Sequence, residues 1–324
     1  IDSSWSPSIL TSINLFGVNL SGKFQVIFGL TKIVAVGAII GITLTSFSTG
    51  NSQNFVNPLW PKTFDWHTVL AVGAALRYSF FAFSGWEGST YMAEEIKQPQ
   101  KTLPLSLFFG ISGVMLLYLG ANMGYLFQLN VNEIIKEKWV ATAAMKVVLG
   151  ATGGILISIA VAINAFGNIS TQILCKSRTW HAMARDGLFF EKFRELHPRF
   201  NTPNNALVGQ GIWATVLLVF AVLSTYYQSG IGGTNTYEII IDFFSATSTI
   251  FNLLTFGAIY VLRKKWPDKD RPYRALFYPW SMIIVLFLYS VFLIITLITA
   301  FVPSLVGIVL TASGTLYYLK KVKN

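Results

Sequence analysis

Charged residues are absent from six long stretches of this chain: between Lys32 and Lys62, Lys101 and Glu133, Lys146 and Lys176, Arg199 and Glu238, Asp242 and Arg263, and Arg274 and Lys320. Each stretch can hold an apolar helix of about 20 residues, the length that crosses a bilayer. The last is long enough for two such helices, with Pro303 near its middle. Another stretch, from Trp66 to Ala93, is interrupted only by Arg77 and Glu87.

The pattern therefore predicts an all-α transmembrane protein with eight spans, at residues 24–46, 68–93, 105–129, 148–174, 205–226, 239–262, 277–299 and 302–319. Composition agrees, because 53% of the residues are hydrophobic and 12% are charged, against roughly a quarter charged in soluble domains. The mean hydropathy of +0.56 excludes a water-soluble globular protein. One Cys excludes a disulfide scaffold, and no His has a partner at metal-ligand spacing, so we expect no metal and no cofactor.

The Lys and Arg residues behind the net charge of +10 are concentrated in the loops on one side of the predicted spans. Lys23, the loops after the second, fourth and sixth spans, and the C-terminal tail hold 18 Lys and Arg residues, whereas the opposite loops hold 4. Basic loops face the cytoplasm, so we expect both ends of the chain to be cytoplasmic. The same distribution argues against nucleic acid as a partner, because the charge is explained by topology.

The chain begins without Met and enters through an apolar run at residues 9–16. We interpret this run as the tail of a preceding helix in an N-terminally truncated fragment. A short interfacial helix in an intact protein is the alternative.

The second predicted span contains an irregular segment. It reads Phe-Phe-Ala-Phe-Ser-Gly-Trp-Glu-Gly-Ser-Thr over residues 80–90, with Gly85, Glu87 and Gly88 near its middle. Gly weakens a helix by about 1 kcal/mol, and a carboxylate at membrane depth costs more. Unwound backbone is tolerated there only where it lines a cavity or meets a ligand. Alternatively, the glycines permit close packing and Glu87 is hydrogen-bonded to a neighbour.

Three polar residues inside other spans are further candidates. Lys32 could extend to the cytoplasmic surface or act as a buried functional ammonium. Asn164 and Asn168 share one face of the fourth span, which favours interhelical hydrogen bonds over ion ligation. No intramembrane cluster of His, Asp or Cys is present, which argues against a membrane-embedded enzyme.

Several segments together resemble amino acid permeases of the amino acid/polyamine/organocation superfamily, especially the L-type branch. They occur in the family's order along nearly the whole chain, at residues 81–87, 91–104, 177–178, 183–188, 197–203 and 271–274. The family has twelve helices, the first ten forming two inverted repeats. The resemblance implies that residues 1–23 end the fourth helix and its loop, 24–46 form the fifth, 47–262 form the second repeat with a break near 83–89, and 263–324 hold the last two spans.

The resemblance also implies roles for site residues. The unwound segment would bind the substrate's amino group through its backbone, and it comprises Phe81, Ala82, Phe83, Ser84, Gly85, Trp86 and Glu87. Phe81 would be the aromatic gate. Lys32 would place its ammonium where sodium-dependent relatives bind sodium, with Asn164 and Asn168 lining that region. Glu87 stands where several L-type relatives have Asn. Its carboxylate could favour a substrate with a cationic side chain, take up a proton, or form an ion pair with Lys or Arg.

The expected function is secondary transport of amino acids across the plasma membrane by alternating access, independent of sodium and coupled to exchange or to protons. Its partners would be an amino acid and the bilayer. One rival is a sensor or scaffold that kept the fold and lost transport. Another is a transporter of polyamines or other organic cations.

Overall fold

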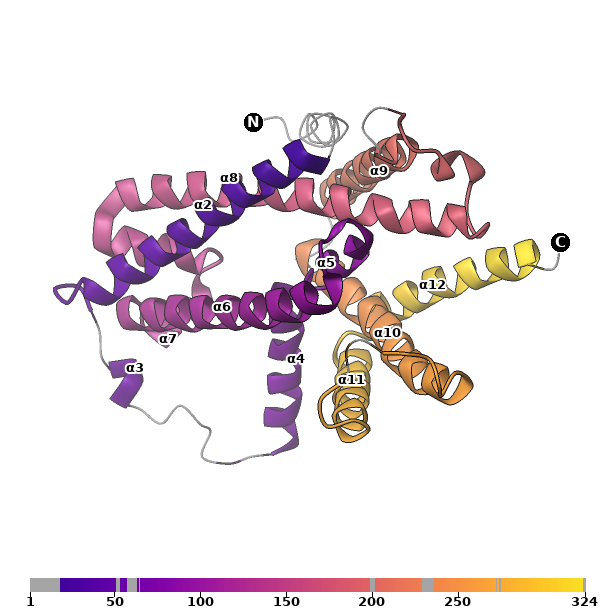
Figure 1. Ribbon diagram of the computed structural model, residues 1–324. Coiled ribbons are helices and arrows are strands. Elements are labelled where there is room, and N and C mark those ends of the chain that lie inside the picture. Colours follow the sequence, from indigo (N-terminus) through magenta and orange to yellow (C-terminus); the bar gives the residue numbers. More distant parts are fainter. Residues whose placement is uncertain are drawn as a thin grey trace. The chain divides into compact units, whose positions relative to one another are not determined.

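A computed structural model describes residues 18–50, 53–56, 63, 65–198, 202–228, 236–271, 273 and 275–322. All regular secondary structure in these ranges is helical (Figure 1). The elements are α2 (Val18–Thr45), α3 (Gln53–Val56), α4 (Trp66–Ala82), α5 (Gly88–Tyr91), η2 (Ala93–Glu95), α6 (Pro99–Gln128), α7 (Val131–Lys136), α8 (Val140–Arg185), η3 (Glu191–Arg194), α9 (Asn204–Gln228), α10 (Thr236–Lys265), α11 (Trp280–Thr299) and α12 (Phe301–Val322).

Seven of the predicted spans overlap long helices, namely α2, α6, α8, α9, α10, α11 and α12, whereas the predicted span 68–93 is helical only as far as Ala82, in α4, and continues in turns and the short α5. Within the described residues, five stretches of helix are long and apolar enough to cross a membrane, at residues 25–45, 99–128, 140–185, 241–265 and 280–299. Helix α4 has 17 residues, fewer than the roughly 20 that a span requires. Membrane crossing by α4, α9 and α12 stays a prediction. The predicted helix tail at residues 9–16 lies outside the described residues.

The surfaces of these helices are apolar. On α11, Ile283, Phe287 and Ile294 are each more than half exposed. On α2, Val26, Leu30 and Val34 are exposed to a similar extent. Apolar surface of this extent requires an apolar solvent, so the exposed side chains agree with the hydropathy of the sequence.

Helix α8 contains a sharp break that the sequence analysis did not anticipate. Gly150 has φ 63° and ψ −146°, a backbone conformation that L side chains avoid. A Cβ added at Gly153 would collide with the carbonyl oxygen of Met145, although residues eight apart in a straight helix lie about 12 Å apart along its axis. The chain therefore turns back at Gly150, and the predicted span corresponds to the helix that follows.

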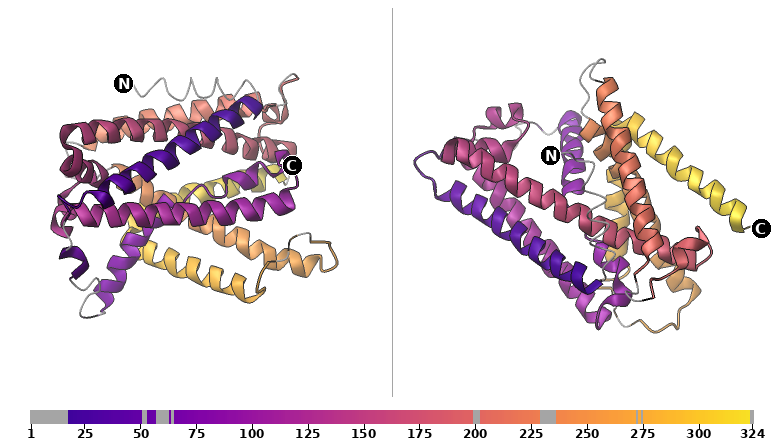
Figure 2. Two further views of the ribbon diagram at one scale, coloured as in Figure 1. Left: turned by 60° about the vertical axis from the view of Figure 1, so that its left-hand side comes forward. Right: turned by 90° about the horizontal axis from the view of Figure 1, so that it is seen from above.

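The residues fall into two compact units, each considered by itself. Unit 1 comprises Ile1–Pro61, Gly88–Ile96 and Leu103–Val216, and unit 2 comprises Lys62–Glu87, Lys97–Thr102 and Leu217–Asn324. In unit 1, α2 lies along α8, and α5 and η3 also contact α8 (Figure 1). In unit 2, α10 packs against α4, α11 and α12, the last two being the orange-to-yellow helices of Figure 2.

Glycine permits the close contact between α6 and α2. A Cβ added at Gly120 would lie 3.0 Å from Ile40 Cδ1, and one added at Gly124 would collide with the Thr43 hydroxyl. Two glycines four residues apart on one helix face are a common device for close helix packing in membranes. Next to this contact, the Gln128 amide donates a hydrogen bond of 2.5 Å to the Thr43 carbonyl.

Asn54 of α3 binds the C-terminal end of α6. Its side-chain amide donates hydrogen bonds of 2.7 Å to the carbonyls of Leu126 and Leu129. The last carbonyls of a helix have no partner within the helix. The short α3 therefore satisfies the C-terminal end of α6.

Replacing Gly124 by Ala should destabilise the protein, because the added methyl overpacks the contact with the buried Thr43; overpacking typically costs about 1–3 kcal/mol. Gly113 on the same helix has no atom within 4 Å of an added Cβ, so Gly113→Ala is the matched control and should be neutral or stabilising. Thermal unfolding of the detergent-solubilised protein measures both. Equal midpoints for the two variants would contradict the role of Gly124.

Candidate functional site

The interruption predicted in the second span lies between α4 and α5. Helix α4 continues through Ala82, and residues 83–87 form turns before α5 begins at Gly88. The Phe83 N–H donates to the Ser79 carbonyl at 3.0 Å, so Phe81 and Ala82 are still helical rather than unwound. The N–H of Ser84 then donates to the Phe81 carbonyl, also at 3.0 Å.

Gly85 and Glu87 shape this interruption together. Gly85 has φ 94°, a left-handed conformation that costs other L residues about 1–2 kcal/mol. Its N–H donates a hydrogen bond of 3.1 Å to Glu87 Oε2. Glu87 is thus hydrogen-bonded to a neighbour, as one alternative from the sequence proposed. The carboxylate supports the turn, and a helix could not continue through it.

The predicted gate, Phe81, packs edge-on against Phe244 of α10, with ring centroids 5.5 Å apart. The preceding residue, Phe80, contacts Phe292 of α11 at 4.9 Å. The end of α4 is therefore held by aromatic rings from two helices of unit 2. Ala82, Phe83, Ser84 and Trp86 lie in the same segment, at the end of α4 and in the turns that follow.

The other predicted residues meet in unit 1. Lys32 of α2 donates a hydrogen bond of 2.5 Å from its Nζ to Asn168 Oδ1 of α8. The Asn168 amide donates in turn to Asn164 Oδ1 at 3.5 Å. The ammonium thus points across to α8 and forms the interhelical hydrogen bond expected of the asparagines. The role of all three residues in ion coupling stays a prediction.

Gly167 allows α2 and α8 to approach at this point. A Cβ added there would lie 3.2 Å from Phe28 and 3.3 Å from Lys32 Cε. Phe28 and Lys32 are one helical turn apart, so they lie on the same face of α2, and this face points toward α8. A larger residue at 167 would have to displace the side chain of Phe28 or Lys32.

Sequence reasoning missed the polar contacts that extend this seam. Gln25 lies seven residues before Lys32, and its amide donates to the Ser170 hydroxyl at 3.3 Å. The Thr171 hydroxyl donates to Gln25 Oε1 at 2.5 Å. A heptad spacing between Gln25 and Lys32, matched by Asn164 and Thr171, was the signal available.

A second polar pair that sequence reasoning missed lies in unit 2. Arg77 of α4 donates to Asp242 of α10 at 2.5 Å, and the two side chains are 9% and 16% exposed. The Arg77 Nε is buried without a hydrogen-bond partner. The signal was present in the sequence, because Arg77 and Asp242 are opposite charges within or at the start of predicted spans.

The segments that carried the family resemblance also contact one another. Arg178 of α8 donates to both carboxylate oxygens of Glu95, at 2.7 and 3.3 Å. Two helical turns further along α8, Arg185 donates to Glu94 at 3.2 Å. Lys176 lies 5.4 Å from the centre of the Tyr91 ring. The loop after the interruption is therefore fixed to α8 of the same unit.

No group of three or more His, Cys, Asp or Glu residues in the described part of the chain is arranged to hold a metal ion.

Residues 8–319 match the family described as amino acid permease. The chain belongs to this family. It is 29% identical over 290 residues to the serine/threonine exchanger SteT of Bacillus subtilis, covering 86% of this chain and 59% of that protein. It is 26% identical over 320 residues to the large neutral amino acids transporter small subunit 2 of mouse, covering 96% and 55%.

The human cystine/glutamate transporter is 24% identical over 273 residues, which cover 84% of this chain and 51% of that protein. The chain thus spans about half the length of the curated relatives it matches. As an L-type-like permease with several apolar helices, it is an integral multi-pass membrane protein.

Gly85→Ala should destabilise this permease, because the methyl group disfavours the positive φ on which the turn depends. Gly88→Ala is the matched control, since its Cβ would make an ordinary contact of 3.6 Å with Cys175 Sγ. Thermal unfolding of the detergent-solubilised protein measures both variants. If Gly88→Ala proved the more damaging, the turn at Gly85 would not be the sensitive point.

Removing one partner of the Arg77–Asp242 pair should destabilise the protein by about 3–5 kcal/mol, because a buried charge is left uncompensated. We expect Arg77→Met and Asp242→Leu together to be less damaging than either alone, as a double-mutant cycle would measure. The exposed Arg185–Glu94 pair is the control, with about 0–1 kcal/mol expected. Additive effects of the two buried substitutions would show that the pair does not act as a unit.

Proposed function

We propose that the permease carries amino acids across the membrane by secondary active transport with alternating access, without sodium and coupled to exchange or to protons. The observation that carries the proposal is the Lys32 ammonium, which is held between α2 and α8 by Asn168. An ammonium supplies the single positive charge that a bound sodium ion would supply, and asparagine oxygens serve either cation.

The interrupted helix supports the substrate half of the proposal. Residues 83–87 are outside any regular helix, and the C-terminal end of α4 is the negative end of its dipole, which favours an ammonium group. We assign the amino group of the substrate to this segment, with Phe81 as its gate. The named relatives include an exchanger of serine and threonine, which is consistent with small zwitterionic substrates.

The Lys32 charge would link substrate binding to the exchange of outward and inward states. Its contact joins α2 to α8 across a seam that Gly167 keeps narrow. A change of conformation that separates these helices has to break or move that contact. Loss of the charge should therefore affect the rate of transport more than the affinity for substrate.

Uptake of a labelled amino acid by the full-length permease in proteoliposomes tests this proposal. Lys32→Ala should lower the initial rate about tenfold or more, within the usual range of coupling energies, while substrate affinity changes little. Lys32→Gln keeps a donor for Asn168 but removes the charge, and should lower the initial uptake rate as much as Lys32→Ala does. Lys136→Ala, an exposed lysine of α7, is the control.

Each contrary result has a defined meaning. Unchanged uptake by Lys32→Ala would leave Lys32 a surface-directed side chain. Strict sodium dependence of the unmodified permease would overturn the ion assignment. Absence of amino acid uptake in a correctly folded permease would favour the sensor or scaffold, and uptake of polyamines alone would favour the organic-cation transporter.

A further inference from the structure

The connection between α10 and α11 lies directly at the end of two candidate spans. One span ends at Lys265, and the next begins at Trp280. Trp266 and Trp280 are 48% and 69% exposed. Tryptophan concentrates where hydrocarbon gives way to headgroups, so these two side chains mark the interface on both sides of the connection.

The segment from 263 to 274 is strongly basic. It holds six Lys and Arg residues against Asp268 and Asp270, a net charge of +4. Exposed apolar side chains follow at once, with Leu276 at 71% and Phe277 at 83%. Basic charge beside exposed apolar residues at a span end is the combination that attracts anionic lipid.

Two arginines of this segment have local structural partners. Arg271 donates to the carbonyls of Trp266 and Pro267, at 2.5 and 2.9 Å, which follow directly after the end of α10. The Arg263 guanidinium stacks 3.7 Å from the centre of the Tyr278 ring. These contacts hold the two arginines within the loop, whereas Lys265 and Lys269 do not take part in them.

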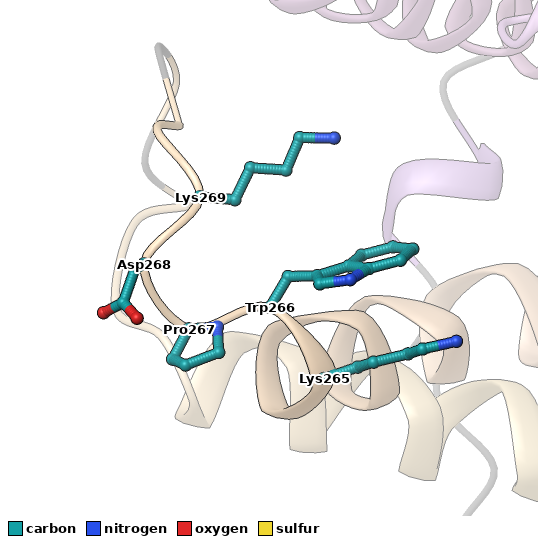
Figure 3. A pocket seen from close by; sticks show the side chains of 5 residues that line it. All are labelled: Lys265, Trp266, Pro267, Asp268 and Lys269. Carbon is teal, nitrogen blue, oxygen red and sulfur yellow. The ribbon is translucent and has the colours of Figure 1, made fainter.

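Lys265 and Lys269 flank one indole ring. Their Nζ atoms lie 5.1 and 5.6 Å from the centre of the Trp266 ring. Figure 3 shows the Trp266 side chain between the two lysine side chains, whereas Asp268 points away from them. These residues and Pro267 line a shallow pocket. Neither lysine forms an ion pair with any residue that the structure describes.

We propose that Lys265, Trp266 and Lys269 bind the phosphate of an anionic phospholipid headgroup in the adjacent leaflet. The two ammoniums supply six N–H donors for phosphate oxygens, and the indole supports the glycerol backbone at the interface. Leu276 and Phe277 contact the acyl chains. We choose a membrane lipid as the ligand because the site lies at the ends of two candidate spans, where headgroups are expected.

Native mass spectrometry of the full-length permease in detergent tests this site with phosphatidylglycerol and phosphatidylcholine. The unmodified permease should bind phosphatidylglycerol in preference. Lys265→Gln/Lys269→Gln should weaken that binding about 25-fold, from roughly fivefold for each lysine near an anionic surface, and should leave phosphatidylcholine binding unchanged. Lys265→Arg/Lys269→Arg should restore it.

The control variant, Lys136→Gln/Lys138→Gln, removes the same charge from two exposed residues at another loop and should bind phosphatidylglycerol normally. Equal loss in the control would overturn the site in favour of general charge attraction. Equal binding of the two lipids would also overturn it. Displacement of the lipid by millimolar inorganic phosphate or by a short oligonucleotide would assign the pocket to a free phosphate or to nucleic acid instead.

Discussion

The contact of Lys32 with Asn168 depends on how closely α2 and α8 approach, and Gly167 sets that distance. A Cβ at 167 would lie 3.2 Å from Phe28 and 3.3 Å from Lys32 Cε, so glycine lets the two helices and the lysine stem pack together without displacing either side chain. The ammonium then has a short path to Asn168 across the seam. Without the close approach, the same lysine would lose this contact, and the polar contacts of Gln25 and the packing of Phe28 against Phe166 would remain across the seam.

The remaining polar contacts follow from an apolar exterior. A polar group that faces hydrocarbon without a partner is costly, and the exposed faces of α2 and α11 carry hydrophobic residues. Polar side chains consequently find partners on neighbouring helices. Arg77 pairs with Asp242 and joins α4 to α10, and the Gln128 amide donates to the Thr43 backbone carbonyl and joins α6 to α2.

The interrupted segment is followed along the chain by an anchored one. The chain leaves the interruption through α5, and Arg178 and Arg185 hold the following loop to α8 through Glu95 and Glu94. The turns at residues 83–87 are thus followed by an anchored segment.

Sequence by itself determined the helical class, the approximate positions of the long helices and the place of the interruption after α4. Charge-free stretches of about 20 residues specify helices in lipid, and Gly85 beside Glu87 is a poor continuation of any helix. Only the tertiary structure decided which residues meet. Arg77 and Asp242 are 165 residues apart, and hydropathy carries no information about pairing across that distance. The reversal at Gly150 escaped prediction for a related reason, because a single glycine in an apolar run is compatible with a straight helix until its φ and ψ are known.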